Sequence, residues 1–202
     1  MKIFLATKNK NKLIEMQRIL MPFGIEVLSE VNSDFKINDV DETGRNFDEN
    51  AYLKAKSACD CTGLPALADD SGLCVDALNG APGLYSARFA GLEQSDDKNN
   101  EKLLDLLNDV NDENRTAKFV CSMCCCFPNG DVVRGYGECK GYIARALNGN
   151  GGFGYDPLFI CGEKTFAQMS KEEKDAVSHR GKAIDDFVEN LKKYLGENNA
   201  DK

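Results

Sequence analysis

Two β-strands joined by a tight turn are predicted by residues 116–142, which run TAKFVCSMCCCFPNGDVVRGYGECKGY. The two strands are Thr116 to Phe127 and Asp131 to Tyr142, and Pro128-Asn129-Gly130 separates them. Asn-Gly between two strand-like runs is a strong hairpin signal, because both residues tolerate a positive φ. Strands and helices are predicted to alternate on either side of this hairpin. The pattern therefore indicates the α/β class with a mixed sheet.

Outside the hairpin, residues 2–6 and 25–28 have the apolar character of short buried strands. Helices are expected to begin after residues whose side-chain oxygens can accept hydrogen bonds from free backbone N–H groups. These capping residues are Thr7, Asn46, Ser95 and Ser170. The polar tail, residues 196–202, is expected to fray after the last helix. We expect residues 1–202 to form one domain.

The charge of the chain limits its partners. The formal net charge is −8, so the general positive field that gathers nucleic acids is absent. The longest apolar stretches are short, such as Ile3 to Ala6, and cannot span a bilayer. The same stretch is too short for the core of a signal peptide. We therefore expect neither a nucleic-acid nor a membrane partner.

Nine cysteines need an interpretation, since four of them lie within residues 121–126. Their odd number, without an export signal, argues against a disulfide framework. The chain has one histidine, His179, so further zinc ligands are scarce. Cysteine in a strand can serve as a small apolar residue. We expect buried thiols in a reducing compartment, the cytoplasm, with metal or redox use of the cluster as the alternative.

The first motif that could bind a ligand is Thr7-Lys8-Asn9-Lys10-Asn11-Lys12, between a strand end and a helix start. Helix N-termini offer free N–H groups and the positive end of a dipole, which suit phosphate. Three lysines in six residues add local positive charge to an acidic chain. The alternative is a solvated lysine surface without a ligand.

The second motif is Asp69-Asp70-Ser71-Gly72, which follows a short apolar run. Adjacent carboxylates at a strand end can hold Mg²⁺ while substrate phosphates and water complete the coordination. Glu42 and Glu49 could add ligands, although Glu49 also suits the capping box of a helix that begins after Asn46. The alternative for the motif is an ordinary turn, because these residue types dominate turns.

The third motif is the glycine-rich run from Gly149 to Pro157, in which Phe153 and Tyr155 could stack on a flat ring. The fourth is Ser178-His179-Arg180-Gly181, preceded by Lys174. Its side chains could donate hydrogen bonds to the carbonyl oxygens of a base. The alternatives are a plain glycine turn and a structural histidine.

In combination and in this order, the motifs resemble those of the non-canonical purine nucleoside triphosphate pyrophosphatases, the inosine/xanthosine triphosphatase family. The resemblance runs from the first strand to the last helix. The stretches that carry it are residues 6–12, 42–44, 47–51 with 54–55, 68–73, 80–83 with 86–88, 151–157 and 178–183.

The resemblance implies Mg²⁺-dependent hydrolysis of ITP, dITP and XTP to the monophosphate and pyrophosphate. It also implies a homodimer, and an elongated mixed sheet with flanking helices and two lobes around a central cleft. Glu42 and Asp70 would hold the metal, and Asp70 would also be the catalytic base. The implied substrate-binding residues are Thr7, Lys8, Asn9, Lys10, Asn11, Lys12, Ser71, Phe153, Gly154, Tyr155, Asp156, Lys174, His179 and Arg180.

Two other functions remain open at this point. A purine-nucleotide-binding regulator without catalysis would keep the lysine and glycine motifs and use the carboxylates as turn residues. A metal-independent serine hydrolase would use Ser71 and His179, but residues 70–72 lack the nucleophile-elbow pattern.

Overall fold

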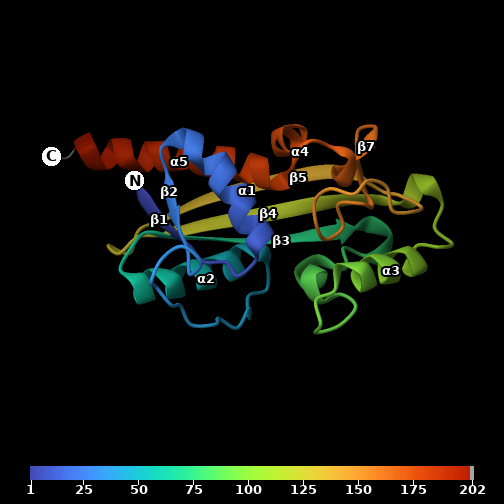
Figure 1. The fold of residues 1–202 in the computed structure, drawn as a ribbon, viewed down its shortest axis with the longest axis horizontal. Helices are drawn as coiled ribbons and strands as arrows, with labels where there is room; N and C mark the ends of the chain where they lie inside the picture. Colours follow the sequence, from blue (N-terminus) through green and yellow to red (C-terminus); the bar gives the residue numbers. More distant parts are fainter. Residues whose placement is uncertain (201–202) are drawn as a thin grey trace. The chain divides into compact units, whose positions relative to one another are not determined.

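The computed structural model describes the backbone of residues 1–200 and the side chains of residues 1–196 (Figure 1). Seven strands are hydrogen-bonded in the order β2-β1-β3-β4-β5-β6-β7. β1 pairs in parallel with β2 and β3, whereas β6 pairs antiparallel with β5 and β7. The expected α/β class with a mixed sheet is therefore confirmed. The strands are Lys2–Leu5, Glu26–Leu28, Ala66–Val75, Thr116–Cys126, Val132–Ile143, Phe159–Cys161 and Lys164–Thr165.

Five α-helices accompany these strands in the described residues. They are α1 Lys10–Leu20, α2 Phe47–Thr62, α3 Asp96–Leu106, α4 Lys171–Val177 and α5 His179–Ala200. Three of the expected caps are confirmed, because the side chains of Asn46, Ser95 and Ser170 accept hydrogen bonds from the first turns of α2, α3 and α4. None of the helices is long and apolar enough to cross a membrane, as far as the structure describes them.

The described chain divides into two compact units. Unit 1 contains residues 1–70, 121–137 and those from 182 onward, and unit 2 contains residues 71–120 and 138–181. The core of unit 2 gathers around Phe119, Phe159 and Phe166, whose rings pack against one another. The central cleft implied by the resemblance stays a prediction.

In unit 1, the sheet buries both of its faces. Alternate residues of β1 point in opposite directions, so Ile3 packs with α1 and α5, and Phe4 packs with α2. Figure 1 shows α1 and α5 on one side of these strands and α2 on the other. The cysteines of β4 follow the same alternation and are all buried, which confirms the expectation of buried thiols for this cluster. Outside it, Cys61 is exposed, and Cys74 and Cys161 are partly exposed. No group of three metal-ligating side chains gathers among the described residues.

One interpretation of local structure is wrong. Asp69-Asp70-Ser71-Gly72 does not form a turn but lies inside β3, because that strand continues to Val75. The backbone of α5 is helical to Ala200, and residues 201–202 lie outside the described part, so the expected fraying of residues 196–202 stays a prediction.

Candidate functional site

The lysine-rich motif lies between β1 and α1, as expected, but its cap is Asn9 rather than Thr7. The Asn9 Oδ1 accepts hydrogen bonds from the backbone N–H groups of Asn11 at 2.9 Å and Lys12 at 3.1 Å. Thr7 instead accepts one from the Asn9 N–H at 3.2 Å through its Oγ1. Thr7 lies two positions before the cap, too early to reach the N–H groups of the first turn. The loop therefore ends in a capped helix N-terminus, a common binding site for anions.

The three lysines of this motif point to different surroundings. Lys8 and Lys10 are exposed, and Lys8 forms an ion pair with Asp39. Lys12 instead turns toward β3, where its Nζ lies 2.9 Å from the Asp69 carboxylate. Asp69 is buried, and it also accepts a 3.9 Å contact from the Cys121 thiol. The Lys12 side chain is thus held in place by a buried anion.

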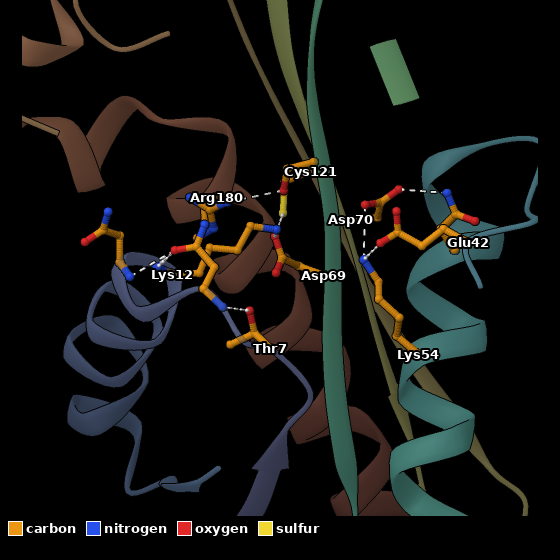
Figure 2. Close-up of polar contacts among 12 residues, drawn as sticks. Thr7, Lys12, Glu42, Lys54, Asp69, Asp70, Cys121 and Arg180 are labelled. Carbon is orange, nitrogen blue, oxygen red and sulfur yellow. Dashed lines mark hydrogen bonds and ion pairs between the residues drawn. The ribbon is translucent and has the colours of Figure 1, made fainter. Parts of the chain in front are cut away.

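Asp69 and Asp70 lie on opposite faces of β3, as neighbouring residues of a strand must. Figure 2 shows Asp69 on the side of Lys12, and Asp70 on the side of Glu42 and Lys54. The adjacent carboxylates therefore serve two separate clusters, both within unit 1.

Lys54 occupies the centre of the second cluster. Its Nζ donates to Glu42 Oε1 at 2.9 Å and to Asp70 Oδ1 at 3.1 Å. The other Asp70 oxygen accepts a hydrogen bond from the Asn50 amide, also at 3.1 Å. The structure thus brings together Glu42 and Asp70, the two residues expected to hold a metal. Sequence reasoning had given Lys54 and Asn50 no role, although their spacing of four puts them on one face of α2.

The protonation of this cluster follows from its burial. Burial raises the pKa of Asp70, the Lys54 ammonium opposes the rise, and the Glu42 carboxylate adds to it. Burial also acts to lower the pKa of Lys54, but the negative charges of Asp70, Asp69 and Glu42 outweigh it and raise that pKa. Lys54 therefore remains a cation. Asp70 gains proton affinity, which a general base requires.

The donor set at Glu42 and Asp70 fits a hard divalent cation. Mg²⁺ binds oxygen ligands and commonly uses one or two carboxylates together with substrate phosphates. Both carboxylates form ion pairs with the same positive charge, the Lys54 ammonium. The pair can therefore face a common cation.

In unit 2, Asp156 organises the glycine-rich loop. One of its oxygens, Oδ2, accepts hydrogen bonds from the Phe153 N–H at 2.9 Å and from Lys174 Nζ at 2.8 Å. The Lys174 ammonium also lies 5.0 Å from the centre of the Phe153 ring, within the range of a cation–π contact. A Cβ added to Gly152 would stand 1.9 Å from the Asp156 carboxylate, so only glycine fits there.

The aromatic rings of this loop have different surroundings. Phe153 is partly exposed, and the Arg180 guanidinium lies 5.8 Å from its centre. Tyr155 is 4% exposed, packs in the core and donates its hydroxyl hydrogen bond to the Ser86 carbonyl at 2.8 Å. Burial is the main reason why the pKa of Tyr155 is raised. Phe153 is therefore the ring of this loop that has a face near the surface.

His179 and Arg180 begin α5 and are both buried. The His179 ring stacks on Phe119, with centroids 4.6 Å apart and planes inclined by 11°. The Arg180 guanidinium lies 3.4 Å from the Ser71 hydroxyl. Unit 2 thus contains all the implied substrate-binding residues that lie outside the lysine-rich motif. They are Ser71, Phe153, Gly154, Tyr155, Asp156, Lys174, His179 and Arg180.

Comparison with known proteins decides the family of this chain. Residues 3–190 match the model of the Ham1 family. The chain belongs to the Ham1 family. This membership confirms the family that the motifs had indicated.

Relatives and solved structures of the Ham1 family extend over nearly the whole chain. A dITP/XTP pyrophosphatase of Desulforamulus reducens is 49% identical over 193 residues, which cover 95% of this chain and 96% of the relative. Another, of Geobacter sulfurreducens, is 50% identical over 187 residues, 91% of this chain and 92% of the relative. The Ham1 protein of Staphylococcus aureus has a TM-score of 0.82 at 39% identity, covering 96% of this chain and 100% of that structure.

Proposed function

We propose that this chain is a nucleoside triphosphate pyrophosphatase that hydrolyses ITP, dITP and XTP to the nucleoside monophosphate and pyrophosphate. The observation that carries the proposal is the match of at least 91% of the chain to relatives named dITP/XTP pyrophosphatase. In this function the chain removes non-canonical purine nucleotides from the nucleotide pool.

In the proposed reaction, the oxygen of a water molecule bonds to the α-phosphorus, and the bond from that phosphorus to the pyrophosphate oxygen breaks. Asp70 takes the proton from the attacking water, a role that its raised pKa supports. Negative charge develops on the phosphoryl oxygens and on the departing pyrophosphate. Lys12 and the positive end of the α1 dipole, at the capped N-terminus of the helix, supply positive charge that can stabilise it.

We further propose Mg²⁺ as the cofactor, with Glu42 and Asp70 as its protein ligands. When bound, the ion supplies electrostatic stabilisation of the negatively charged phosphate oxygens. The oxygen-only donor set and the cation already held between the two carboxylates support this assignment.

Selection of the base is assigned to unit 2. The Phe153 ring offers a surface on which a purine can stack, and Lys174, His179 and Arg180 offer hydrogen-bond donors. The 6-oxo group of hypoxanthine or xanthine accepts such bonds. Adenine carries an amino group there and would leave buried donors without a partner, which is costly.

A panel of nucleoside triphosphates tests the function and the cofactor together. We expect ITP, dITP and XTP to give monophosphate and pyrophosphate in equal amounts, and EDTA to abolish the reaction until Mg²⁺ is restored. Release of inorganic phosphate and a nucleoside diphosphate would contradict the assigned bond cleavage. Binding of ITP without any product would instead favour the non-catalytic nucleotide-binding regulator.

Two further properties belong to this proposal, a cytoplasmic location and a homodimer. The nine cysteines, all free thiols, support a reducing compartment. The homodimer is proposed from the family resemblance, and light scattering on the purified protein tests it. A species of twice the chain mass is expected, and a monomer at micromolar concentration would contradict it.

A further inference from the structure

Two side chains in the first turns of α3 form hydrogen bonds with the backbone N–H and the carbonyl group of Gly154, in the glycine-rich loop. Asp96 Oδ2 accepts a hydrogen bond from the Gly154 N–H at 2.7 Å, and Asn100 Nδ2 donates one to the Gly154 carbonyl oxygen at 2.9 Å. Asp96 and Asn100 are four residues apart and therefore share one face of the helix. Asn100 is 4% exposed. We call these two side chains the Gly154 clamp.

We propose that Asp96 and Asn100 are positioning residues that set the affinity for the purine base by fixing the backbone at Gly154. The inference rests on the proposed function, because it assigns the Phe153 ring to base binding. Neither residue belongs to the motifs that indicated the family.

Gly154 needs such a clamp because packing does not hold it. Its φ of +61° lies in the left-handed region, and a Cβ added there would meet no atom within 4 Å. A glycine in open space can reach many backbone conformations. The two hydrogen bonds from α3 therefore select one of them.

The neighbours of Gly154 show what its conformation controls. Tyr155 is anchored in the core by burial and by its bond to the Ser86 carbonyl. Phe153, on the other side, is partly exposed and lies beside the Lys174 and Arg180 cations. Both backbone polar groups of Phe153 are hydrogen-bonded to Asp156, so a rotation at Gly154 would leave Tyr155 in place, disturb these two bonds and shift the Phe153 ring relative to the cations. The clamp therefore holds the Phe153 ring, the proposed stacking surface, in a fixed position relative to Lys174 and Arg180, which are proposed to donate hydrogen bonds to the base.

The expected kinetic effect is on substrate affinity rather than on bond cleavage. The side chains assigned to the reaction, Asp70 and Glu42, belong to unit 1, and the clamp belongs to unit 2. Loss of either clamp bond should raise KM for ITP about fivefold, the value of one ordinary hydrogen bond, and change kcat less than about twofold.

The test uses Asp96→Ala, Asp96→Asn and Asn100→Leu, with Asn99→Leu as the matched control. Asn99 is equally buried on the same helix, but it bonds to the Ala90 N–H at 2.7 Å and the Ala87 carbonyl at 3.1 Å rather than to the loop. Asp96 is exposed, so its replacement leaves the folded core intact. Asp96→Asn keeps an oxygen acceptor and should recover most of the wild-type KM.

Steady-state kinetics with ITP, and thermal unfolding of each variant, then decide the matter. The clamp predicts a raised KM in Asp96→Ala and Asn100→Leu, and an unchanged KM in Asn99→Leu even where its Tm falls as far. An unchanged KM in Asp96→Ala, or an equal rise in Asn99→Leu, would overturn the clamp. A wild-type chain that releases no pyrophosphate from ITP would overturn the proposed function itself, which separates the two failures.

Discussion

At the residue scale, the site depends on how Asp70 is held. Its carboxylate is buried, which favours the protonated form, and yet the Lys54 ammonium lies 3.1 Å away and favours the charged form. The balance raises the pKa of Asp70. The cluster thereby keeps a proton acceptor next to a fixed positive charge, an arrangement suited to deprotonating water beside a phosphate.

Replacing Asp70 by asparagine tests this role. Asp70→Asn keeps the shape of the side chain and removes the proton acceptor, so kcat for ITP should fall at least about 100-fold. The variant should still fold, at a lower Tm, because Lys54 and Asn50 both donate to Asp70 and the single amide oxygen of asparagine can accept from only one of them. Pyrophosphate release and thermal unfolding provide the two measurements. Retained turnover would remove Asp70 from the reaction.

Lys54 gives a separate test of the metal assignment. In Lys54→Met the carboxylates of Glu42 and Asp70 lose their shared cation, and stability should fall by about 2 kcal/mol, below the value for a fully buried pair. Thermal unfolding with and without Mg²⁺ measures the effect, and Mg²⁺ should restore more of the Tm in this variant than in wild type.

The matched control for Lys54→Met is Lys56→Met on the same helix, where Lys56 pairs with Asp60 at the surface. An exposed pair contributes little, so this variant should lose less than about 1 kcal/mol and show no added response to Mg²⁺. An equal Mg²⁺ response in both variants, or none in Lys54→Met, would argue against a metal at Glu42 and Asp70.

At this scale the sequence indicated the identity of the site residues, but not all of the contacts between them. Glu42 and Asp70 were expected together, and the structure joins them through Lys54. The partner of Lys12 was not expected, because Asp69 lies 57 positions away along the chain and only the packing of α1 on β3 brings the two together. Contacts over such separations leave no local pattern in a single sequence.

At the element scale, β3 shows where local signals fail. Asp-Asp-Ser-Gly has the composition of a turn, but the strand continues through it, between β1 and β4 in the sheet. Hydrogen bonds to neighbouring strands outweigh local preference. Helix starts at Asn46, Ser95 and Ser170 were predictable because a cap is a contact within four residues.

The packing of β5 against α5 provides a prediction at this scale. A Cβ added at Gly135 would lie 2.4 Å from the Ala183 carbonyl oxygen and 2.6 Å from the Phe187 Cβ. Gly135→Ala should therefore destabilise the fold by about 1–3 kcal/mol through overpacking. Chemical denaturation measures it, with Gly196→Ala in α5 as the control, since a Cβ there meets nothing within 4 Å. Equal free energies of unfolding for Gly135→Ala and Gly196→Ala would contradict the close contact of β5 with α5.

At the scale of the whole molecule, the net charge is negative, and individual lysines provide positive charge only locally. A net charge of −8 gives no general attraction for polyanions. Lys12 at a helix N-terminus and Lys54 between two carboxylates are instead fixed by specific contacts. The proposed triphosphate substrate would therefore meet locally fixed positive charges rather than a general positive field.

The mixed sheet was predictable at this scale because one hairpin and alternating helices restrict the topology. The strand order was not, because β3 pairs with β1 across the whole of α1, β2 and α2. The composition of the two units was equally hidden from the sequence, since each unit is assembled from separate segments of the chain.

The most direct test of the account is the ratio of kcat/KM for ITP to that for ATP, measured by pyrophosphate release with Mg²⁺ present. Donors that meet a 6-oxo group predict a preference for ITP of at least about 100-fold. Equal kcat/KM values for the two substrates, or a preference for ATP, would contradict it.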